Sequence, residues 1–167
     1  VDPVMGDHGR LYVSQDVAKN IIEKLIPQAD IITPNVWELG YISQQNINSL
    51  PEVMAATKGL GRSALVSSVP VGEDIGALLH NDSAAFLAKH RKFAKVPHGG
   101  GDALAGAFLA HLLNGEDHDA AFAQSVSSVF NILSQAAEQG LTGIPLIQYQ
   151  DTLLTSTPLK LERLPID

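Results

Sequence analysis

The chain of 167 residues contains no cysteine, which excludes disulfide bonds and thiolate nucleophiles. This absence fits a reducing compartment, so we expect a cytoplasmic protein. No apolar run reaches the roughly 18 residues of a membrane span, and we expect no membrane partner. Basic residues are also scarce, because 11 Lys and Arg stand against 18 Asp and Glu and give a net charge of −7. We expect no nucleic-acid partner, since phosphate backbones attract basic surfaces.

The composition supports a packed core. Hydrophobic residues make up 45% of the chain and charged residues 17%, which argues against disorder. The length suits one domain or part of a larger one. The chain opens on "VDPVMGD", which lacks an initiator methionine and reads as the end of a strand. We therefore expect residues 1–167 to be the C-terminal part of one domain of a longer protein.

Hydrophobic periodicity predicts alternating helices and strands. Expected helices cover 16–27, 36–43, 49–58, 102–113 and 118–138. Expected strands cover 29–33, 63–69, 75–81 and 84–93, and the tail from Pro145 onward is ambiguous. Ser49 and Glu52 form a predicted capping box. Strands that alternate with helices are typical of an α/β fold with a parallel sheet.

The most unusual segment is "PHGGGDALAGAFLAHLL", in which three glycines precede an acid and an apolar helix. The helix carries a predicted inward stripe of Leu104, Phe108, Leu109, Leu112 and Leu113. Gly99, Gly100 and Gly101 can present bare N–H groups at a helix N-terminus, where phosphate commonly binds.

Asp102 has two interpretations at this position. It either caps the helix, or it is a general base that accepts the proton of a hydroxyl. A base beside an amide cradle is what phosphoryl transfer to an alcohol requires.

Three further acids stand at element boundaries. Asp2 and Asp7 flank "PVMG", and Glu38 follows a second predicted strand in "TPNVWE". Carboxylates at neighbouring strand ends could hold Mg²⁺, which prefers oxygen ligands. Each acid also has a plain structural interpretation, as a turn residue or as a solvated helix residue.

Four segments follow one another in an order found in the ribokinase superfamily, namely "VDPVMGD", "ADIITPNVWELG", "ALVSSV" and "PHGGGDALAGAF". Over essentially its whole length the chain resembles the pyridoxal kinase family of this superfamily. The resemblance implies a ribokinase-like three-layer α/β fold with a mainly parallel sheet covered by helices, in which the N-terminal strands and lid are absent. It also implies transfer of the ATP γ-phosphate to the 5′-hydroxyl of pyridoxal, pyridoxine or pyridoxamine.

The resemblance assigns roles to individual residues. Asp102 matches the catalytic base and also contacts the substrate, and Gly99, Gly100 and Gly101 match the anion hole. Asp2, Asp7 and Glu38 match acids that organise Mg²⁺ and ATP. The remaining expected ATP-binding residues are Thr33, Asn35, Ser67, Ser68 and Phe93, with Gly100 again among them, and Tyr12 is expected near the vitamin.

The resemblance further implies Mg²⁺ with ATP, a monovalent cation such as K⁺, and a homodimer. One departure concerns the glycine loop, because the usual Gly-Thr-Gly-Asp has Gly100 in place of threonine, and weaker ATP handling follows. Two alternatives stay open. One is a hydroxymethylpyrimidine kinase of thiamine synthesis, and the other is a non-catalytic fragment that binds a nucleotide or pyridoxal 5′-phosphate.

Overall fold

The computed structural model describes residues 1–166, and the chain divides into two compact units. Unit 1 comprises residues 1–87 with 163–166, and unit 2 comprises residues 88–162. Each unit is described by itself below. Within residues 1–166, no helix combines the length and the apolar character needed to cross a bilayer.

Three helical segments of unit 1 confirm the predicted helices. The segment predicted as 16–27 consists of α1 (Gln15–Asn20), a π-helical turn (Ile21–Leu25) and a 3₁₀ turn (Ile26–Gln28). It is followed along the chain by α2 (Val36–Ser43) and α3 (Leu50–Gly59). The predicted capping box at Ser49 is wrong, because the Ser49 side chain makes no cap hydrogen bond and Glu52 Oε2 accepts instead from the backbone N–H of Asn48 at 2.7 Å.

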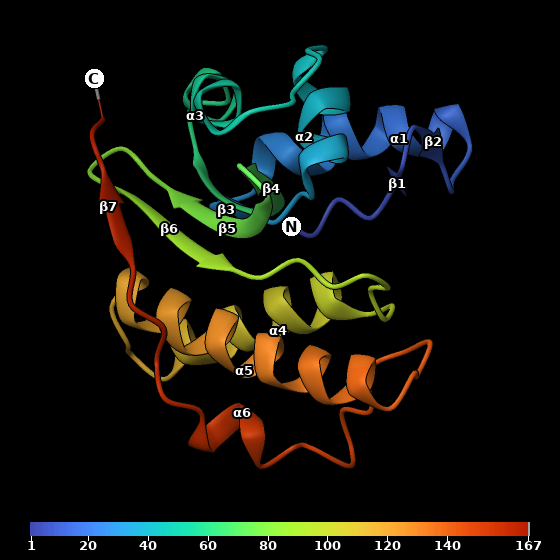
Figure 1. The fold of residues 1–167 in the computed structure, drawn as a ribbon. Helices are drawn as coiled ribbons and strands as arrows, with labels where there is room; N and C mark the ends of the chain where they lie inside the picture. Colours follow the sequence, from blue (N-terminus) through green and yellow to red (C-terminus); the bar gives the residue numbers. More distant parts are fainter. Residues whose placement is uncertain (167) are drawn as a thin grey trace. The chain divides into compact units, whose positions relative to one another are not determined.

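A five-stranded sheet has the order β3-β4-β5-β6-β7 (Figure 1). Its strands are β3 (Ile31–Ile32), β4 (Ser63–Val71), β5 (Asp74–His80), β6 (Ala85–His90) and β7 (Glu162–Leu164). β3 is shorter than the predicted 29–33. A separate antiparallel hairpin joins β1 (Gly6–Asp7) to β2 (Arg10–Leu11).

The sheet is mixed rather than mainly parallel within this chain. β3 runs parallel to β4, with Ile31 beside Ser63, whereas β4 and β5 are antiparallel. The physical reason is the short connection, because β4 and β5 are separated by only Gly72 and Glu73, and a two-residue link joins antiparallel strands. The α/β class itself is confirmed.

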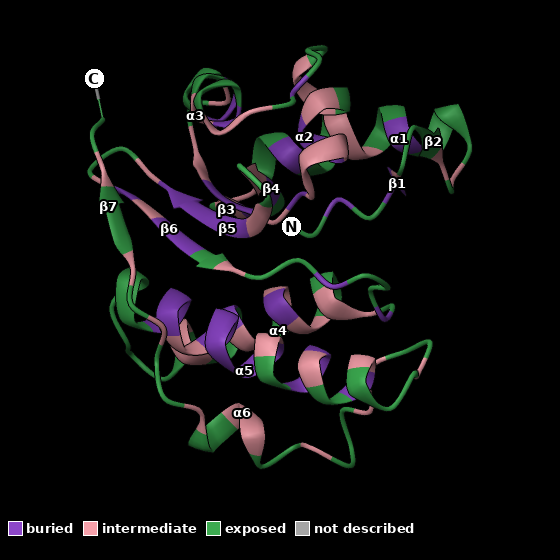
Figure 2. Ribbon diagram, in the orientation of Figure 1, coloured by how far each residue is buried: buried purple, intermediate pink, exposed green. Residues whose placement is uncertain are grey.

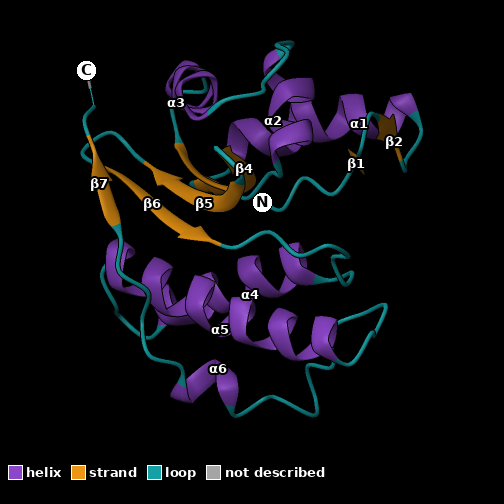
Figure 3. Ribbon diagram, in the orientation of Figure 1, coloured by secondary structure: helices purple, strands orange, loops and turns teal. Residues whose placement is uncertain are grey.

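The core of unit 1 lies between the strands and the helices α2 and α3, which pack against β4 (Figures 2 and 3). Fully buried side chains at its centre include Ile32, Leu39, Val53, Val66 and Leu78. Residues on β4 are buried in an uninterrupted run at Ala64, Leu65 and Val66, as expected for a central strand.

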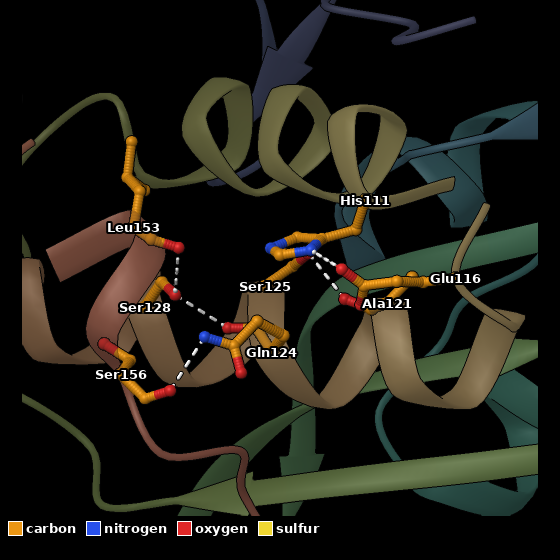
Figure 4. A network of polar contacts seen from close by, with 8 residues as sticks. All are labelled: His111, Glu116, Ala121, Gln124, Ser125, Ser128, Leu153 and Ser156. Carbon is orange, nitrogen blue, oxygen red and sulfur yellow. Dashed lines mark hydrogen bonds and ion pairs between the residues drawn. The ribbon is translucent and has the colours of Figure 1, made fainter. Parts of the chain in front are cut away.

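Unit 2 is built on two packed helices, α4 (Gly100–Leu113) and α5 (His118–Glu138), with the short α6 (Thr152–Thr155) against α5. Figure 4 shows the polar contacts that join these helices. Gln124 Nε2 donates to the carbonyl of Ser156 at 2.7 Å, and Ser128 Oγ donates to the carbonyl of Leu153 at 3.3 Å. His111 Nδ1 lies 2.6 Å from Glu116 Oε1, which closes the α4–α5 turn.

The predicted apolar stripe of α4 is wrong at two positions. Leu104 and Phe108 are buried, but Leu109 and Leu113 are 55% and 79% exposed. Each exposed leucine follows the buried face by one residue, which rotates it about 100° around the helix axis. In α5 the side chain of Phe122 is fully buried.

Candidate functional site

Glu38 connects two segments that the sequence analysis singled out, "VMG" and "TPNVWE". Its Oε1 accepts from the backbone N–H groups of Met5 and Gly6, at 2.9 and 3.3 Å. Its Oε2 accepts from the N–H of Asn35 at 2.9 Å, and Asn35 Oδ1 accepts in return from the N–H of Glu38 at 2.8 Å. This reciprocal pair is a capping box at the start of α2. The side chain of Glu38 therefore links the Met5–Gly6 segment to the start of α2 through hydrogen bonds.

Burial sets the protonation of this carboxyl. Glu38 is only 4% exposed, and burial raises its pKa; the N–H groups of Met5, Asn35 and Gly6 act in the opposite direction, and the nearby Asp2 raises it further. Because the folded pKa is raised, this group favours the fold most at acidic pH, and its contribution declines as pH rises through the folded pKa.

Asn35 and Ser67 lie side by side where two parallel strands end. The N–H of Ser67 donates to the carbonyl of Pro34 at 3.0 Å, and a parallel bridge links Asn35 to Ser67. The register of β4 against β5 slips between Val66 and Val69, and Ser68 adopts a φ of 60°. This bulge turns Ser68 outward, where it is exposed.

Thr33 adds an unpaired polar atom near the same strand end. Its N–H donates to the carbonyl of Val1 at 3.0 Å, which places the first residue of the chain beside β3. Its hydroxyl Oγ1 is buried and has no hydrogen-bond partner. A buried hydroxyl without a partner is uncommon, and such atoms concentrate where a ligand or water completes the structure.

The three acids do not form one metal centre. Among residues 1–166, no group of three or more His, Cys, Asp and Glu side chains could hold a metal ion. Asp2 acts electrostatically on Glu38, so these two acids are neighbours. Asp7 instead accepts from the N–H of His8 at 2.7 Å and pairs with its ring at 3.4 Å. The structure therefore places Asp2 near Glu38, and Asp7 against His8 in the β1–β2 hairpin.

The glycine loop of unit 2 forms the start of α4. Gly99 is the N-cap residue with a φ of 95°, a left-handed conformation that favours glycine, and no side chain caps the helix. The first hydrogen bond of the helix runs from the N–H of Ala103 to the carbonyl of Gly99, at 3.1 Å. The N–H groups of Gly100, Gly101 and Asp102 precede that bond and point out of the helix end without a helical partner.

Two segments hold this loop in place. The N–H of His98 donates to the carbonyl of Thr142 at 2.8 Å, and the N–H of Ile144 donates to the carbonyl of His98 at 3.0 Å. A Cβ at Gly100 would lie 3.2 Å from Leu133 Cδ1, and one at Gly99 would lie 3.2 Å from Ile144 Cγ1. Side chains therefore back the first two glycines closely.

Gly101 differs from its neighbours. A Cβ there would meet no heavy atom within 4 Å, and Gly101 has no positive φ. Neither packing nor backbone conformation within unit 2 requires glycine at this position. The space where a Gly101 side chain would lie is open.

Asp102 occupies the third position of α4, and its side chain is exposed. The N-cap residue is Gly99, so the interpretation of Asp102 as the helix cap is wrong. The arrangement leaves Asp102 available to accept a proton from a bound hydroxyl.

Two predicted contacts lie in different surroundings. Tyr12 is 58% exposed beside the β1–β2 hairpin, where the Arg10 guanidinium lies 5.9 Å from its ring centroid. Phe93 is 9% exposed and stacks on Phe130 with ring centroids 5.5 Å apart. Tyr12 is open to a ligand, whereas most of the Phe93 ring is used in packing.

Sequence reasoning missed the residues that shape the glycine loop. Leu133 lies in the middle of α5, where periodicity predicts only an inward position, and Thr142 and Ile144 lie in a loop without a recognisable motif. Their roles depend on contacts between segments more than 30 residues apart, which a local pattern cannot show.

Comparison with known proteins gives consistent results. A profile of the phosphomethylpyrimidine kinase family matches residues 1–146. The pyridoxal kinase PdxY of Rubrobacter xylanophilus is 34% identical over 163 residues, covering 92% of this chain and 56% of that protein. The pyridoxine/pyridoxal/pyridoxamine kinase of Bordetella avium is 36% identical over 126 residues, covering 69% of this chain and 42% of that protein. The chain thus spans about half the length of these relatives.

Solved structures resemble the fold over nearly the whole chain. The pyridoxal kinase of Entamoeba histolytica has a TM-score of 0.88 and 27% identity, covering 98% of this chain and 61% of that one. A second structure of the Entamoeba histolytica pyridoxal kinase, with PLP, has a TM-score of 0.86 and 26% identity, covering 98% of this chain and 60% of that one.

Replacement of Glu38 by Gln tests whether its hydrogen bonds to the two segments stabilise the fold. Gln offers one oxygen and an NH₂ group, so it cannot accept from Asn35 on one side and from Met5 and Gly6 on the other. We expect E38Q to lower the free energy of unfolding by about 1–3 kcal/mol, the cost of leaving a buried donor unsatisfied. Urea denaturation measures this. The control is E23Q, which changes an exposed acid, and equal stability of the two variants would contradict the role.

Replacement of the two neighbouring glycines separates packing from ligand access. G101A should raise the free energy of unfolding by roughly 0.5–1 kcal/mol, because alanine costs less backbone entropy in a helix. Its methyl group enters the open space beside the N–H groups, so ATP affinity should fall. G100A places a Cβ 3.2 Å from Leu133 Cδ1, which must shift to accept it, so the stability gain should be smaller than in G101A. Thermal denaturation and calorimetric titration with ATP check both, and G101A with unchanged ATP affinity would contradict the anion-hole assignment.

Proposed function

The chain belongs to the phosphomethylpyrimidine kinase family, and on that premise we propose that it is the C-terminal, ATP-binding and catalytic-base part of one domain of a pyridoxal kinase. The reaction forms a bond between the 5′-oxygen of pyridoxal and the γ-phosphorus of ATP. The bond from that phosphorus to the β,γ-bridging oxygen breaks, and ADP leaves with the electron pair. Pyridoxine and pyridoxamine are further acceptors, and pyridoxal 5′-phosphate is the product with pyridoxal.

The proposal depends mainly on the position of Asp102 at the start of α4. Its carboxylate is exposed, does not cap α4, and stands one residue beyond two glycines whose N–H groups lack helical partners. Asp102 accepts the proton of the 5′-hydroxyl as the oxygen attacks phosphorus. The N–H groups at positions 100 and 101 stabilise the charge on the transferring phosphoryl group.

Unit 1 contains further residues that the resemblance to the family assigns to the nucleotide. We assign Asn35, Ser67 and Ser68 to ATP phosphate contacts, because the bulge in β4 exposes Ser68 and the bridge sets Ser67 beside Asn35. Thr33 joins them through its unpaired hydroxyl. Tyr12 borders the vitamin, and Phe93 borders the adenine with an edge of its ring.

The two neighbouring acids of unit 1, Asp2 and Glu38, differ in how they could contribute to a Mg²⁺ site. Both oxygens of Glu38 already accept from backbone N–H groups, whereas the exposed Asp2 is its electrostatic neighbour. Mg²⁺ in kinases retains several waters and binds through one or two carboxylates with substrate phosphates. By the resemblance to the family, Asp2, Asp7 and Glu38 would organise the ion with ATP, and Glu38 also positions the segment that carries the exposed Asp2. When bound, Mg²⁺ neutralises phosphate charge.

The proposal extends to the setting of the enzyme. A monovalent cation such as K⁺ accompanies Mg²⁺·ATP, the enzyme is a homodimer, and it is cytoplasmic. These assignments rest on resemblance to the family together with a chain that lacks cysteine.

A second candidate is hydroxymethylpyrimidine kinase. The matching family profile carries the phosphomethylpyrimidine kinase description, which favours it. The relatives described above are named as pyridoxal or B6 vitamer kinases, which favours the first candidate. The acceptor alone distinguishes the two enzymes, because both need the same base and phosphate site.

Replacement of Asp102 by Asn tests the proposed base. ATP-dependent phosphorylation of pyridoxal should fall by about 100-fold or more in D102N, as loss of a general base typically causes. ATP affinity should change little. The matched control is D119N, which removes an exposed acid from the first turn of α5 and should leave turnover unchanged.

Three outcomes separate the alternatives. Turnover of hydroxymethylpyrimidine but not pyridoxal would support the second candidate. ATP binding without turnover of either acceptor would identify a non-catalytic nucleotide-binding fragment. Unchanged turnover in D102N would remove Asp102 from the mechanism.

A further inference from the structure

The turn between α4 and α5 contains Asn114-Gly115, two residues that lie outside the proposed kinase site. Asparagine side chains are chemically labile, because the main-chain nitrogen of the next residue can attack the amide carbon. A side chain on that next residue hinders the approach, and glycine has none. Asn114 alone of the seven asparagines precedes glycine, and four others precede a stiff β-branched residue, namely Asn20, Asn35, Asn46 and Asn131.

The two remaining asparagines are less open to this attack than Asn114. Asn81 Oδ1 accepts from the N–H of Ser83 at 2.9 Å, which holds its side-chain amide in a turn. Asn48 precedes Ser49, which is small but still carries a side chain. Asn114 is exposed, and its side chain has no hydrogen-bond partner in the part of the chain that the structure describes. Its amide group is therefore free to turn toward the main chain.

Hydrogen bonds across the turn oppose the reaction in the folded chain. The attacking atom is the main-chain nitrogen of Gly115, and its N–H donates to the carbonyl of Leu112 at 3.0 Å. The next N–H, that of Glu116, donates to the carbonyl of His111 at 3.2 Å. The Gly115 nitrogen must leave its acceptor before it can lose its proton and approach the side chain of Asn114. The rate therefore depends on local opening of the turn.

A side-chain contact holds the same turn closed. His111 Nδ1 lies 2.6 Å from Glu116 Oε1, which joins the last turn of α4 to the residue that follows Gly115 (Figure 4). The side chain of His111 is 15% exposed and that of Glu116 is 38% exposed. A hydrogen bond to a carboxylate is stronger than one between neutral groups, so its loss makes opening of the turn easier.

We propose that Asn114 is a site of spontaneous deamidation, and that the His111–Glu116 contact limits its rate. In the opened turn, water accepts the proton of the Gly115 N–H, and the nitrogen uses its electron pair to form a bond to Cγ of Asn114. The bond from Cγ to Nδ2 breaks, and Nδ2 takes a proton from water and leaves as ammonia. Water then adds to a carbonyl carbon of the resulting succinimide. Cleavage of the ring bond to Cγ gives aspartate, and cleavage of the ring bond to the main-chain carbon gives isoaspartate.

Either product places a carboxylate at the C-terminal end of α4. The carbonyl groups at that end carry partial negative charge, and Glu116 and Asp117 follow within three residues. Isoaspartate also adds a methylene to the main chain, which displaces the N–H groups of the turn from their acceptors. The modification therefore favours the open turn. It is independent of the proposed kinase function, because no residue of the glycine loop takes part.

Peptide mapping by mass spectrometry on the 167-residue chain tests the site. The folded chain and the chain in guanidinium chloride are incubated at the same pH and temperature, and deamidation is followed at each asparagine. Asn114 should react first in both samples, at a rate at least about tenfold lower in the folded chain, the factor for an opening free energy of about 1.4 kcal/mol. Faster loss at Asn48 would overturn the choice of Asn114. Equal rates in the two samples would overturn the control by the turn.

Replacement of Glu116 by Ala tests the role of its contact with His111. E116A should speed deamidation of the folded chain about fivefold, the factor for one hydrogen bond of about 1 kcal/mol, and should change the rate in guanidinium chloride little. The matched control D119A removes the same charge three residues later, from a side chain that accepts from the N–H of Ala120 at 3.0 Å, and should leave the rate unchanged. No acceleration by E116A, or an equal acceleration by D119A, would overturn the role of the contact.

Discussion

The unbonded N–H groups at the start of α4 are the constraint on which the functional account depends. A helix normally covers these donors with a capping side chain, but the N-cap residue here is Gly99, which has no side-chain oxygen. The donors must then face water or an anion. Leu133 and Ile144 lie close behind the adjoining glycines, where added Cβ atoms would each lie 3.2 Å from a side-chain carbon.

The start of α2 shows the opposite solution to the same problem. There Asn35 caps the helix, and the buried Glu38 accepts from the N–H groups of Asn35, Met5 and Gly6. Both carboxylate oxygens of Glu38, a predicted metal ligand, thus accept hydrogen bonds from backbone N–H groups. The N–H groups at the start of α2 are thus bonded to side chains of unit 1. Those at the start of α4 in unit 2 have no capping side chain, so they can bind a ligand.

The sequence predicted the order and type of most elements, because their apolar periodicity is strong and glycine or proline marks their ends. It also predicted that a helix follows the three glycines at residues 99–101, and α4 begins there. It failed where contacts between distant segments decide the outcome. The engagement of Glu38 with Met5, the pairing of Thr57 with His80, and the support of Gly100 by Leu133 all join residues more than 20 positions apart. The predictions for Leu109 and Leu113 were wrong for a different reason. A leucine in a helix is buried only if it lies on the helix face that packs against the core.

The most direct measurement of the central claim is a titration of the ¹⁵N-labelled chain with Mg²⁺·ATP, followed through the backbone amide signals. The account predicts that the amides of Gly100, Gly101 and Asp102 shift most, and that AMP, which lacks the terminal phosphates, leaves them nearly unmoved. Amides at the start of α1, where the N-cap side chain of Ser14 accepts from the N–H of Val17, serve as the internal reference. Shifts of equal size at both helix starts, or none at residues 100–102, would contradict the account.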